Sequence, residues 1–169
     1  MLRLRTYKNS DADKLVTWFS DEETFQKWAA GKLEWPINAD TFRFYAAELL
    51  KEENVWLATA VDEAGTPVGF LCMSDINYQK NSVHFSMIIV SDKYRGKGYG
   101  SQMLKLAIRY ATELLGMKRI TIRVFENNEG AKKCYERLGF RYEAYYPEAL
   151  KWKNHSWGAF DVALEWQNN

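Results

Sequence analysis

The sequence lacks an excess of charge, long apolar runs and clustered cysteines, and each absence excludes a class of function. Lysine and arginine number 23 and aspartate and glutamate 22 among 169 residues, so overall charge gives no reason to expect a nucleic-acid or anionic-membrane partner. No apolar run approaches the roughly 20 residues of a membrane span. The chain starts with alternating apolar and basic residues, not with the apolar segment of a signal peptide. We therefore expect a cytoplasmic protein with no membrane or nucleic-acid partner.

The chain has two cysteines, Cys72 and Cys134, which lie far apart in the sequence. Metal sites and disulfide frameworks need closely spaced or more numerous cysteines. We expect no metal, and two buried thiols in a reducing compartment. The length fits a single domain over residues 1–169.

Apolar periodicity and turn residues divide the chain into strands and helices. Strands are predicted over residues 2–6, 55–61, 68–73, 83–90 and 120–124, from 140 onward and over 157–166. Helices are predicted near 15–19, over 22–29, and over 38–50, 103–115 and 131–138. Ser10 to Asp13 resembles a capping box, and Asn38 is a candidate N-cap. Three strands in meander permit antiparallel pairing, and the later strand–helix–strand order implies a parallel crossover. We expect an α/β (α+β) fold whose mixed, mostly antiparallel central sheet is flanked by helices.

The segment from Tyr94 to Gly100 is short, basic and rich in glycine, and it joins a predicted strand to a predicted helix. A helix N-terminus carries unpaired N–H groups and a partial positive charge, and glycine lets the backbone approach a ligand. Lys93, Arg95 and Lys97 add positive charge. The segment therefore predicts a phosphate or pyrophosphate site. The simpler alternative is a tight turn whose lysines lie in solvent.

Two common nucleotide-binding motifs do not fit this segment. A dinucleotide fingerprint needs a third glycine where Ser101 or Met103 stands, depending on the register. A P-loop needs glycine at Ser91, and serine or threonine at Gly98. Both mismatches argue against a nucleotide-binding module, which we keep as an alternative.

The same segment and a later one resemble the GNAT superfamily of N-acetyltransferases. The first family signature is Gln or Arg, two residues, Gly, one residue, then Gly or Ala, and it is matched by Arg95, Gly98 and Gly100. The second has Asn, Ala three residues later and Tyr four after that, and ends in Gly-Phe. Its matches are Asn128, Ala131, Tyr135, Gly139 and Phe140. The two motifs have the family's order and separation, and the close match covers about residues 83–142.

The resemblance implies an acyl-CoA N-acyltransferase fold, with acetyl-CoA in a cleft where strand 83–90 splays from strand 119–125. Backbone groups of Ile88, Ile89 and Val90 would pair with the pantetheine arm. The pyrophosphate would be held by amides of Arg95, Gly96, Lys97, Gly98, Tyr99, Gly100 and Ser101. Asn128 would contact the pantetheine arm, and Tyr135 would bind beside it.

The resemblance also implies that Tyr135 is the general acid that protonates the departing thiolate. A thiol titrates near pH 8.5 and a phenol near pH 10, so a positioned phenol can donate a proton as the thiolate develops. The alternative is that Tyr135 is a core aromatic of its helix. Asn128 is equally explained as a helix N-cap, and both of its roles can hold at once.

The sequence departs from the family at the general base: the two positions that carry Glu in family subgroups are Arg123 and Phe85 here. His84 and Ser86 share strand parity with Ile88, so they are expected to face the cleft. Histidine titrates near neutrality, which makes His84 a candidate base, although a lone histidine is more often structural. His155 is a weaker candidate.

The expected reaction is direct attack of a neutral primary amine on acetyl-CoA, with no metal. The acceptor is left open between a protein N-terminus and a small amine. In the family the acceptor pocket is built from the N-terminal helices and the last strands, and seven aromatic residues in those regions are candidates to line it: Trp28, Trp35, Tyr45, Tyr145, Tyr146, Trp152 and Trp157. For each of them the alternative is core packing or a surface position. The main alternative function is a non-catalytic acyl-CoA sensor of the same fold. A homodimer is also left open.

Overall fold

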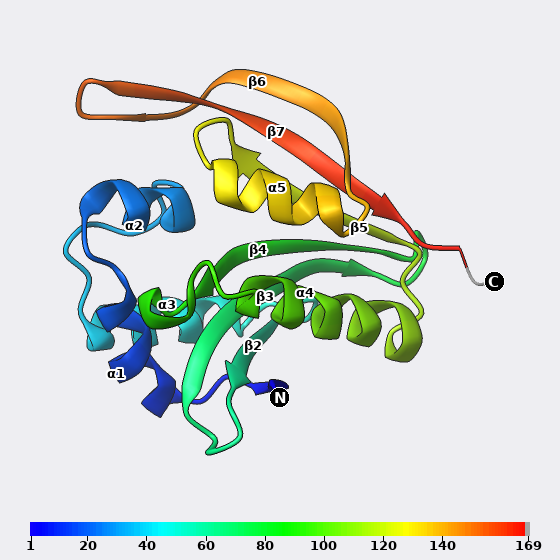
Figure 1. Cartoon of the computed structure of the whole chain (residues 1–169), viewed down its shortest axis with the longest axis horizontal. Helices are drawn as coiled ribbons and strands as arrows, with labels where there is room; N and C mark the ends of the chain where they lie inside the picture. Colours follow the sequence, from blue (N-terminus) through cyan, green and yellow to red (C-terminus); the bar gives the residue numbers. More distant parts are fainter. Residues whose placement is uncertain (168–169) are drawn as a thin grey trace.

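The computed structural model describes residues 1–167 around a seven-stranded sheet in the order β1-β2-β3-β4-β5-β7-β6 (Figure 1). The strands are β1 (Arg3–Thr6), β2 (Trp56–Val61), β3 (Pro67–Asn77), β4 (Ser82–Val90), β5 (Arg119–Phe125), β6 (Arg141–Trp152) and β7 (His155–Glu165). The α-helices are α1 (Ala12–Leu15), α2 (Glu22–Ala29), α3 (Ala39–Leu49), α4 (Tyr99–Arg109) and α5 (Glu129–Arg137).

Neighbouring strands are antiparallel except β4 and β5, which are parallel. Helix α4 connects this pair, and a parallel pair needs such a crossover. The remaining strands are joined antiparallel, partly through tight hairpins such as β6–β7. The expected mixed, mostly antiparallel sheet flanked by helices is confirmed.

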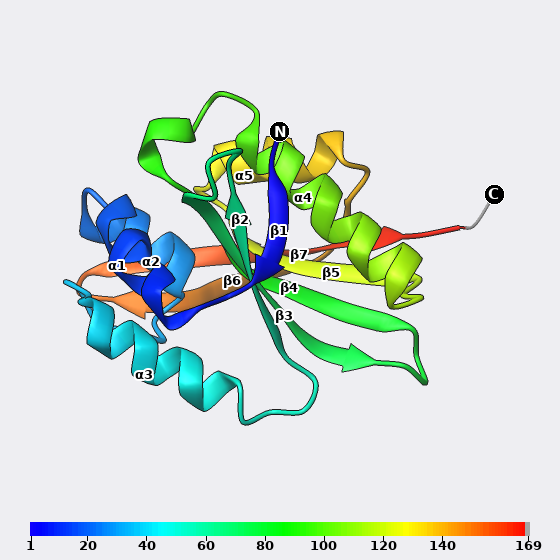
Figure 2. The same cartoon turned by 90° about the horizontal axis from the view of Figure 1, so that it is seen from below.

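Alternate residues of the central strands face two different cores, as the two-residue period of a strand requires. On β3, Leu71 belongs to the core shared with α4 and α5, and its neighbour Cys72 belongs to the core shared with α1, α2 and α3. Figure 2 shows the three N-terminal helices gathered on one side, away from α4 and α5. Helix α4, which follows the glycine-rich segment, therefore packs on one face of the sheet, and α2 packs on the other face. The end of β4 lies between α2 and the glycine-rich segment.

A bulge in β4 ends its pairing with β5 and opens the sheet. The parallel register runs only from Ser82 to Phe85 on β4, and the β3–β4 register shifts immediately beyond. Met87 has a φ of 51°, a left-handed conformation typical of such a bulge. The indole Nε1 of Trp28 donates to the Met87 carbonyl oxygen at 2.7 Å. The splay between β4 and β5 is thus built into the strand and held by α2.

The first helical segment begins differently from the prediction. Ser10 is not the N-cap: a short 3-10 turn starts at Asn9, and the Asp11 carboxylate accepts from the Lys8 N–H at 2.9 Å. Asp11 is buried and also accepts from Arg5 and Thr59, so tertiary contacts determine its place. The Asn38 prediction is confirmed, since its Oδ1 accepts from the Thr41 N–H at 2.8 Å.

Strand β3 is longer than the sequence pattern indicates. β3 continues to Asn77, where a loop was expected, through a second bulge at which Asp75 has a φ of 51°. β6 is an edge strand of 12 residues, most of them exposed. The β6–β7 hairpin reaches past α5 toward α2 (Figure 1), and an ion pair joins Lys153 to Glu22 there.

Both cysteines are free thiols, but their surroundings differ. Cys72 is buried as expected, whereas Cys134 is half-buried, so the prediction of two buried thiols is wrong for Cys134. Within residues 1–167, no helix combines the length and the apolar character needed to cross a membrane.

Candidate active site

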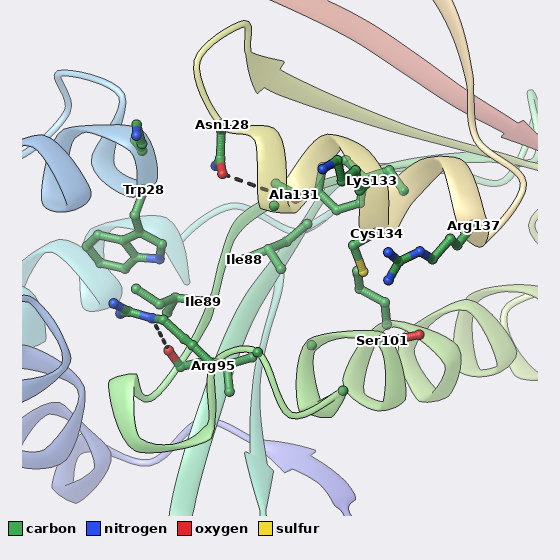
Figure 3. A pocket seen from close by; sticks show the side chains of 18 of the residues that line it. Trp28, Ile88, Ile89, Arg95, Ser101, Asn128, Ala131, Lys133, Cys134 and Arg137 are labelled. Carbon is green, nitrogen blue, oxygen red and sulfur yellow. Dashed lines mark hydrogen bonds between the residues drawn. The ribbon is translucent and has the colours of Figure 1, made fainter.

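A first cavity of about 610 Å³ lies between the end of β4, the glycine-rich segment, α2 and α5 (Figure 3). It is lined by Thr24, Lys27, Trp28, Ile88, Ile89, Val90, Arg95, Gly96, Gly98, Gly100, Ser101, Leu104, Asn128, Gly130, Ala131, Lys133, Cys134, Tyr135 and Arg137. Both sequence motifs contribute to this lining, although more than 25 residues separate them. Each motif follows the carboxyl end of one of the parallel strands β4 and β5, so the pairing of these strands brings the two motifs to the same edge of the sheet.

The glycine-rich segment presents the start of α4 to this cavity. Gly96 and Gly98 have φ of 70° and 82°, the left-handed region that favours glycine, and a Cβ at either would meet no atom within 4 Å. Gly98 is the N-cap position, and no side chain caps α4. The first N–H groups of α4 are therefore available to an anion, which a helix N-terminus stabilises.

The basic side chains of this segment supply less free positive charge to the cavity than the sequence suggested. Arg95 lines it, but its guanidinium donates to the carbonyl oxygens of Val90 (3.0 Å) and Trp18 (2.6 Å), and burial lowers its pKa. Lys97 donates to the Lys93 carbonyl oxygen at 2.8 Å and is absent from the lining. Arg95 thus ties the segment to the rest of the protein.

Tyr99 is also absent from the lining, because its ring packs on Tyr94 with centroids 4.7 Å apart. The cations that do line the cavity include Lys133 and Arg137 on α5, which sequence reasoning missed (Figure 3). They lie four residues apart on the predicted helix, so the sequence already places both on one helix face. Together with the start of α4 they make this cavity suited to a phosphate-bearing ligand.

Tyr135 and Asn128 lie where the first cavity meets a second one. Tyr135 is 7% exposed, packs against Phe140 and lines both cavities. Burial raises its pKa, so the phenol stays protonated at neutral pH. Asn128 Oδ1 accepts from the Ala131 N–H at 3.4 Å, which confirms the N-cap interpretation, and Asn128 also lines both cavities.

The second cavity, of about 510 Å³, lies between β4, β5, β7 and the segment after α2. It is lined by Lys27, Trp28, Ala30, Lys32, Asp75, His84, Ser86, Met87, Ile88, Arg119, Thr121, Ile122, Arg123, Val124, Phe125, Asn128, Tyr135, Glu143, Ala149 and Asp161. Five of these residues also line the first cavity: Lys27, Trp28, Ile88, Asn128 and Tyr135. The two cavities are therefore adjacent, and they share Tyr135.

The strand-parity expectation for β4 is confirmed. His84 and Ser86 line the second cavity, while Phe85 is fully buried in the core on the other face. His84 Nδ1 lies 2.8 Å from Thr121 Oγ1, and burial lowers the pKa of the imidazole, so it is neutral at neutral pH. His155 lies outside both linings, stacked on Trp152 near the hairpin end.

For most of the aromatic residues considered for an acceptor pocket, the alternative of core packing or a surface position is confirmed. Of the seven aromatic residues named for it, Trp28 alone lines either cavity. Trp35 and Tyr45 pack in the N-terminal core, while Trp152 and Trp157 pack in a small cluster with Phe125. The hydroxyls of Tyr145 and Tyr146 on the exposed edge strand donate to Glu126 and Asp161. Charged side chains line the second cavity instead.

No group of three or more His, Cys, Asp or Glu side chains in residues 1–167 is placed to hold a metal ion. The chemistry available in the two adjacent cavities is proton transfer by a protonated phenol at their junction and by a neutral imidazole in the second cavity, together with a helix N-terminus in the first that suits an anion.

Comparisons with known proteins identify the family of the chain. The family model for the acetyltransferase (GNAT) domain matches residues 1–141. A spermine/spermidine N(1)-acetyltransferase of Bacillus subtilis is 37% identical over 68 residues, which are 40% of this chain and 45% of the relative. An uncharacterized N-acetyltransferase of Methanocaldococcus jannaschii is 30% identical over 119 residues, which are 68% of this chain and 46% of the relative. The matches thus span less than half the length of these curated relatives.

The fold is also that of a solved structure, the spermidine N-acetyltransferase from Vibrio cholerae in complex with CoA and spermine. The TM-score is 0.82 at 19% identity, and the superposition covers 97% of this chain and 95% of the other. At this identity the likeness concerns the fold.

Proposed function

The chain belongs to the GNAT acetyltransferase family, and from that premise we propose that it transfers the acetyl group of acetyl-CoA to a primary amine of a small molecule. The observation that carries the proposal is the junction of two cavities at Tyr135. One cavity has an uncapped helix N-terminus at Gly98 for a phosphate group, and the other holds His84. Bound acetyl-CoA would supply a thioester, whose acyl carbon is open to attack by an amine.

The first cavity fits the coenzyme. The N–H groups at the start of α4 are the proposed pyrophosphate contacts, with Lys133 and Arg137 supplying charge across the cavity. Ile88, Ile89 and Val90 lie on β4 beyond its last pair with β5, so their backbone groups on that side are the proposed partners of the pantetheine arm. Arg95 is proposed to position the segment, because its guanidinium already holds two carbonyl oxygens.

The second cavity is proposed to hold the acceptor amine. His84 acts as base only through Nε2, because Nδ1 is paired with Thr121; this requires the tautomer in which Nδ1–H donates to Thr121 Oγ1. Tyr135 is the proposed acid on the other side of the junction, and Asn128 is proposed to contact the pantetheine arm. The relatives named for spermine and spermidine make polyamines the first acceptors to test.

The first experiment is calorimetric titration with acetyl-CoA, with NAD and ATP as controls, followed by CoA-thiol release with a panel of amines. Binding of acetyl-CoA alone, together with amine-dependent thiol release, is the expected result. Binding without thiol release for any amine would favour the acyl-CoA sensor instead. Absence of acetyl-CoA binding by folded protein would contradict both functions.

His84 gives a prediction for the pH dependence. A base must be neutral to accept a proton, and burial lowers the pKa of His84. We therefore expect kcat, at saturating concentrations of both substrates, to be lost as the pH falls through a value below about 6.5, the ordinary pKa of histidine. His84→Gln should lower kcat by about 100-fold and remove this acidic limb. His155→Gln is the control, because His155 lies outside both linings. A wild-type pH profile in His84→Gln would exclude His84 as the base.

A further inference from the structure

The second cavity has charged walls of both signs. Its lining includes four cations, Lys27, Lys32, Arg119 and Arg123, and three carboxylates, Asp75, Glu143 and Asp161. A cavity that selects a polycation needs an excess of carboxylates, because each buried ammonium group must be compensated. The lining shows no such excess.

Most of these charges already have partners within the protein. Arg123 holds Asp161 through two hydrogen bonds of 2.7 and 3.0 Å. Arg119 holds Glu143 and also Glu165, which lies beside it on β7. These arginines hold the pKa of Asp161 and of Glu143 below their usual ranges, so both carboxylates are ionised and engaged.

Asp161, paired with Arg123, and Glu143, paired with Arg119, therefore offer little free negative charge to a ligand. Lys27 lies 3.2 Å from Glu23 on its own helix. Among the side chains of residues 1–167, Lys32 and Asp75 are the two charged lining residues without an ion-pair partner within 4.0 Å. They leave one cation and one anion available in the same cavity.

The position of Asp75 reflects a local backbone feature. It lies in the β3 bulge, next to Ser74, which pairs with His84 across the strands. Its φ of 51° is uncommon outside glycine, although Asp tolerates it, and a bulge of this kind redirects a side chain. Asp75, Lys32 and His84 all line the second cavity, so both charged side chains share the cavity of the proposed base.

We propose, on the basis of the proposed acetyltransferase function, that the acceptor is a primary amine that also carries a carboxylate or similar anionic group, and not a polycation. The amine end would lie by Asp75 and His84, and the anionic end by Lys32. A polyamine with three ammonium groups would meet one carboxylate without an ion-pair partner in residues 1–167, Asp75, and would be repelled by the unpaired ammonium group of Lys32. This substrate class differs from the one named for the spermidine relatives, one of which matches 40% of this chain and another of which shares its fold at 19% identity.

The test uses acceptor pairs that differ by one carboxylate: lysine against cadaverine, and ornithine against putrescine, with spermidine as the polycation. Their kcat/KM values are measured with wild-type protein, Lys32→Glu and Lys80→Glu. Lys80 is the matched control, since it is an exposed lysine that lines neither cavity. Binding of the same amines to the CoA-saturated protein is measured by calorimetry.

The expected result is that the carboxylate-bearing member of each pair is favoured by about tenfold or more in wild-type protein and in Lys80→Glu. Lys32→Glu should remove or reverse that preference while the affinity for acetyl-CoA stays the same. Preference for spermidine or the diamines, or an unchanged preference in Lys32→Glu, would overturn the inference. If no amine is acetylated, the proposed function fails, and the calorimetric preference still decides the charge of the ligand.

Discussion

Gly98→Glu is expected to weaken acetyl-CoA binding by about 100-fold or more. The residue stands at the N-cap of α4, where no side chain occupies the first N–H groups. A glutamate there would place a carboxylate at the helix N-terminus, where it can compete for those N–H groups and repel the pyrophosphate. Loss of two hydrogen bonds to a charged group, at about 1.5–3 kcal/mol each, corresponds to that factor or more. Calorimetric titration with acetyl-CoA measures it.

Gly65→Glu is the matched control for this prediction. Gly65 has a φ of 83°, close to the 82° of Gly98, and a Cβ at either position would meet no atom within 4 Å. Both variants therefore impose the same left-handed conformation on a glutamate, but Gly65 lies in the turn between β2 and β3. Gly65→Glu should bind acetyl-CoA with wild-type affinity. Equal loss of affinity in the two variants, or unchanged affinity in folded Gly98→Glu, would rule out the proposed phosphate site.

The sequence predicted those parts of the site that depend on the local conformation of the backbone. Gly98 has a positive φ that glycine adopts most readily, and Asn128 caps a helix through a local hydrogen bond. Strand parity placed His84 and Ser86 on one face and Phe85 on the other, because side chains alternate along a strand. Each of these features depends on neighbours within a few residues, which a sequence pattern records directly.

The parts that were missed depend on contacts between distant segments. Nothing near Arg95 in the sequence indicates that its guanidinium binds the carbonyl oxygen of Trp18, 77 positions away. The positive charge counted in the glycine-rich segment is therefore partly engaged, and Lys133 and Arg137 of α5 face the cavity in its place. The β4 bulge is another example, since its geometry is supported by the Trp28 hydrogen bond from another layer.

Composition was a poor guide to the second cavity for the same reason. Aromatic residues are abundant, and most of them fill the cores or lie on the edge strand, where burial or hydrogen bonding of a hydroxyl accounts for them. The charges that line the cavity come from strands whose partners were not known from sequence, such as Arg123 on β5 and Asp161 on β7, which are directly opposite in register. Cross-strand pairing is what brings them together.

Tyr135→Phe is expected to lower kcat by about 100- to 10,000-fold, the range for loss of a general acid. The phenol lies at the junction of the two cavities, and burial raises its pKa, so it carries its proton throughout the neutral range. Phenylalanine keeps the ring that packs on Phe140 and removes only the hydroxyl. Affinity for acetyl-CoA should therefore change little, and calorimetry together with thiol release separates the two effects.

Tyr7→Phe is the control that separates a catalytic hydroxyl from a buried one. Tyr7 is 6% exposed, close to the 7% of Tyr135, and its hydroxyl is buried without a hydrogen-bond partner in residues 1–167. It belongs to the N-terminal core and lines neither cavity. Because an unpaired buried hydroxyl is costly, Tyr7→Phe should preserve or raise stability and leave kcat unchanged. Wild-type kcat in Tyr135→Phe would remove Tyr135 as the acid, and an equal fall in both variants would attribute the loss to packing.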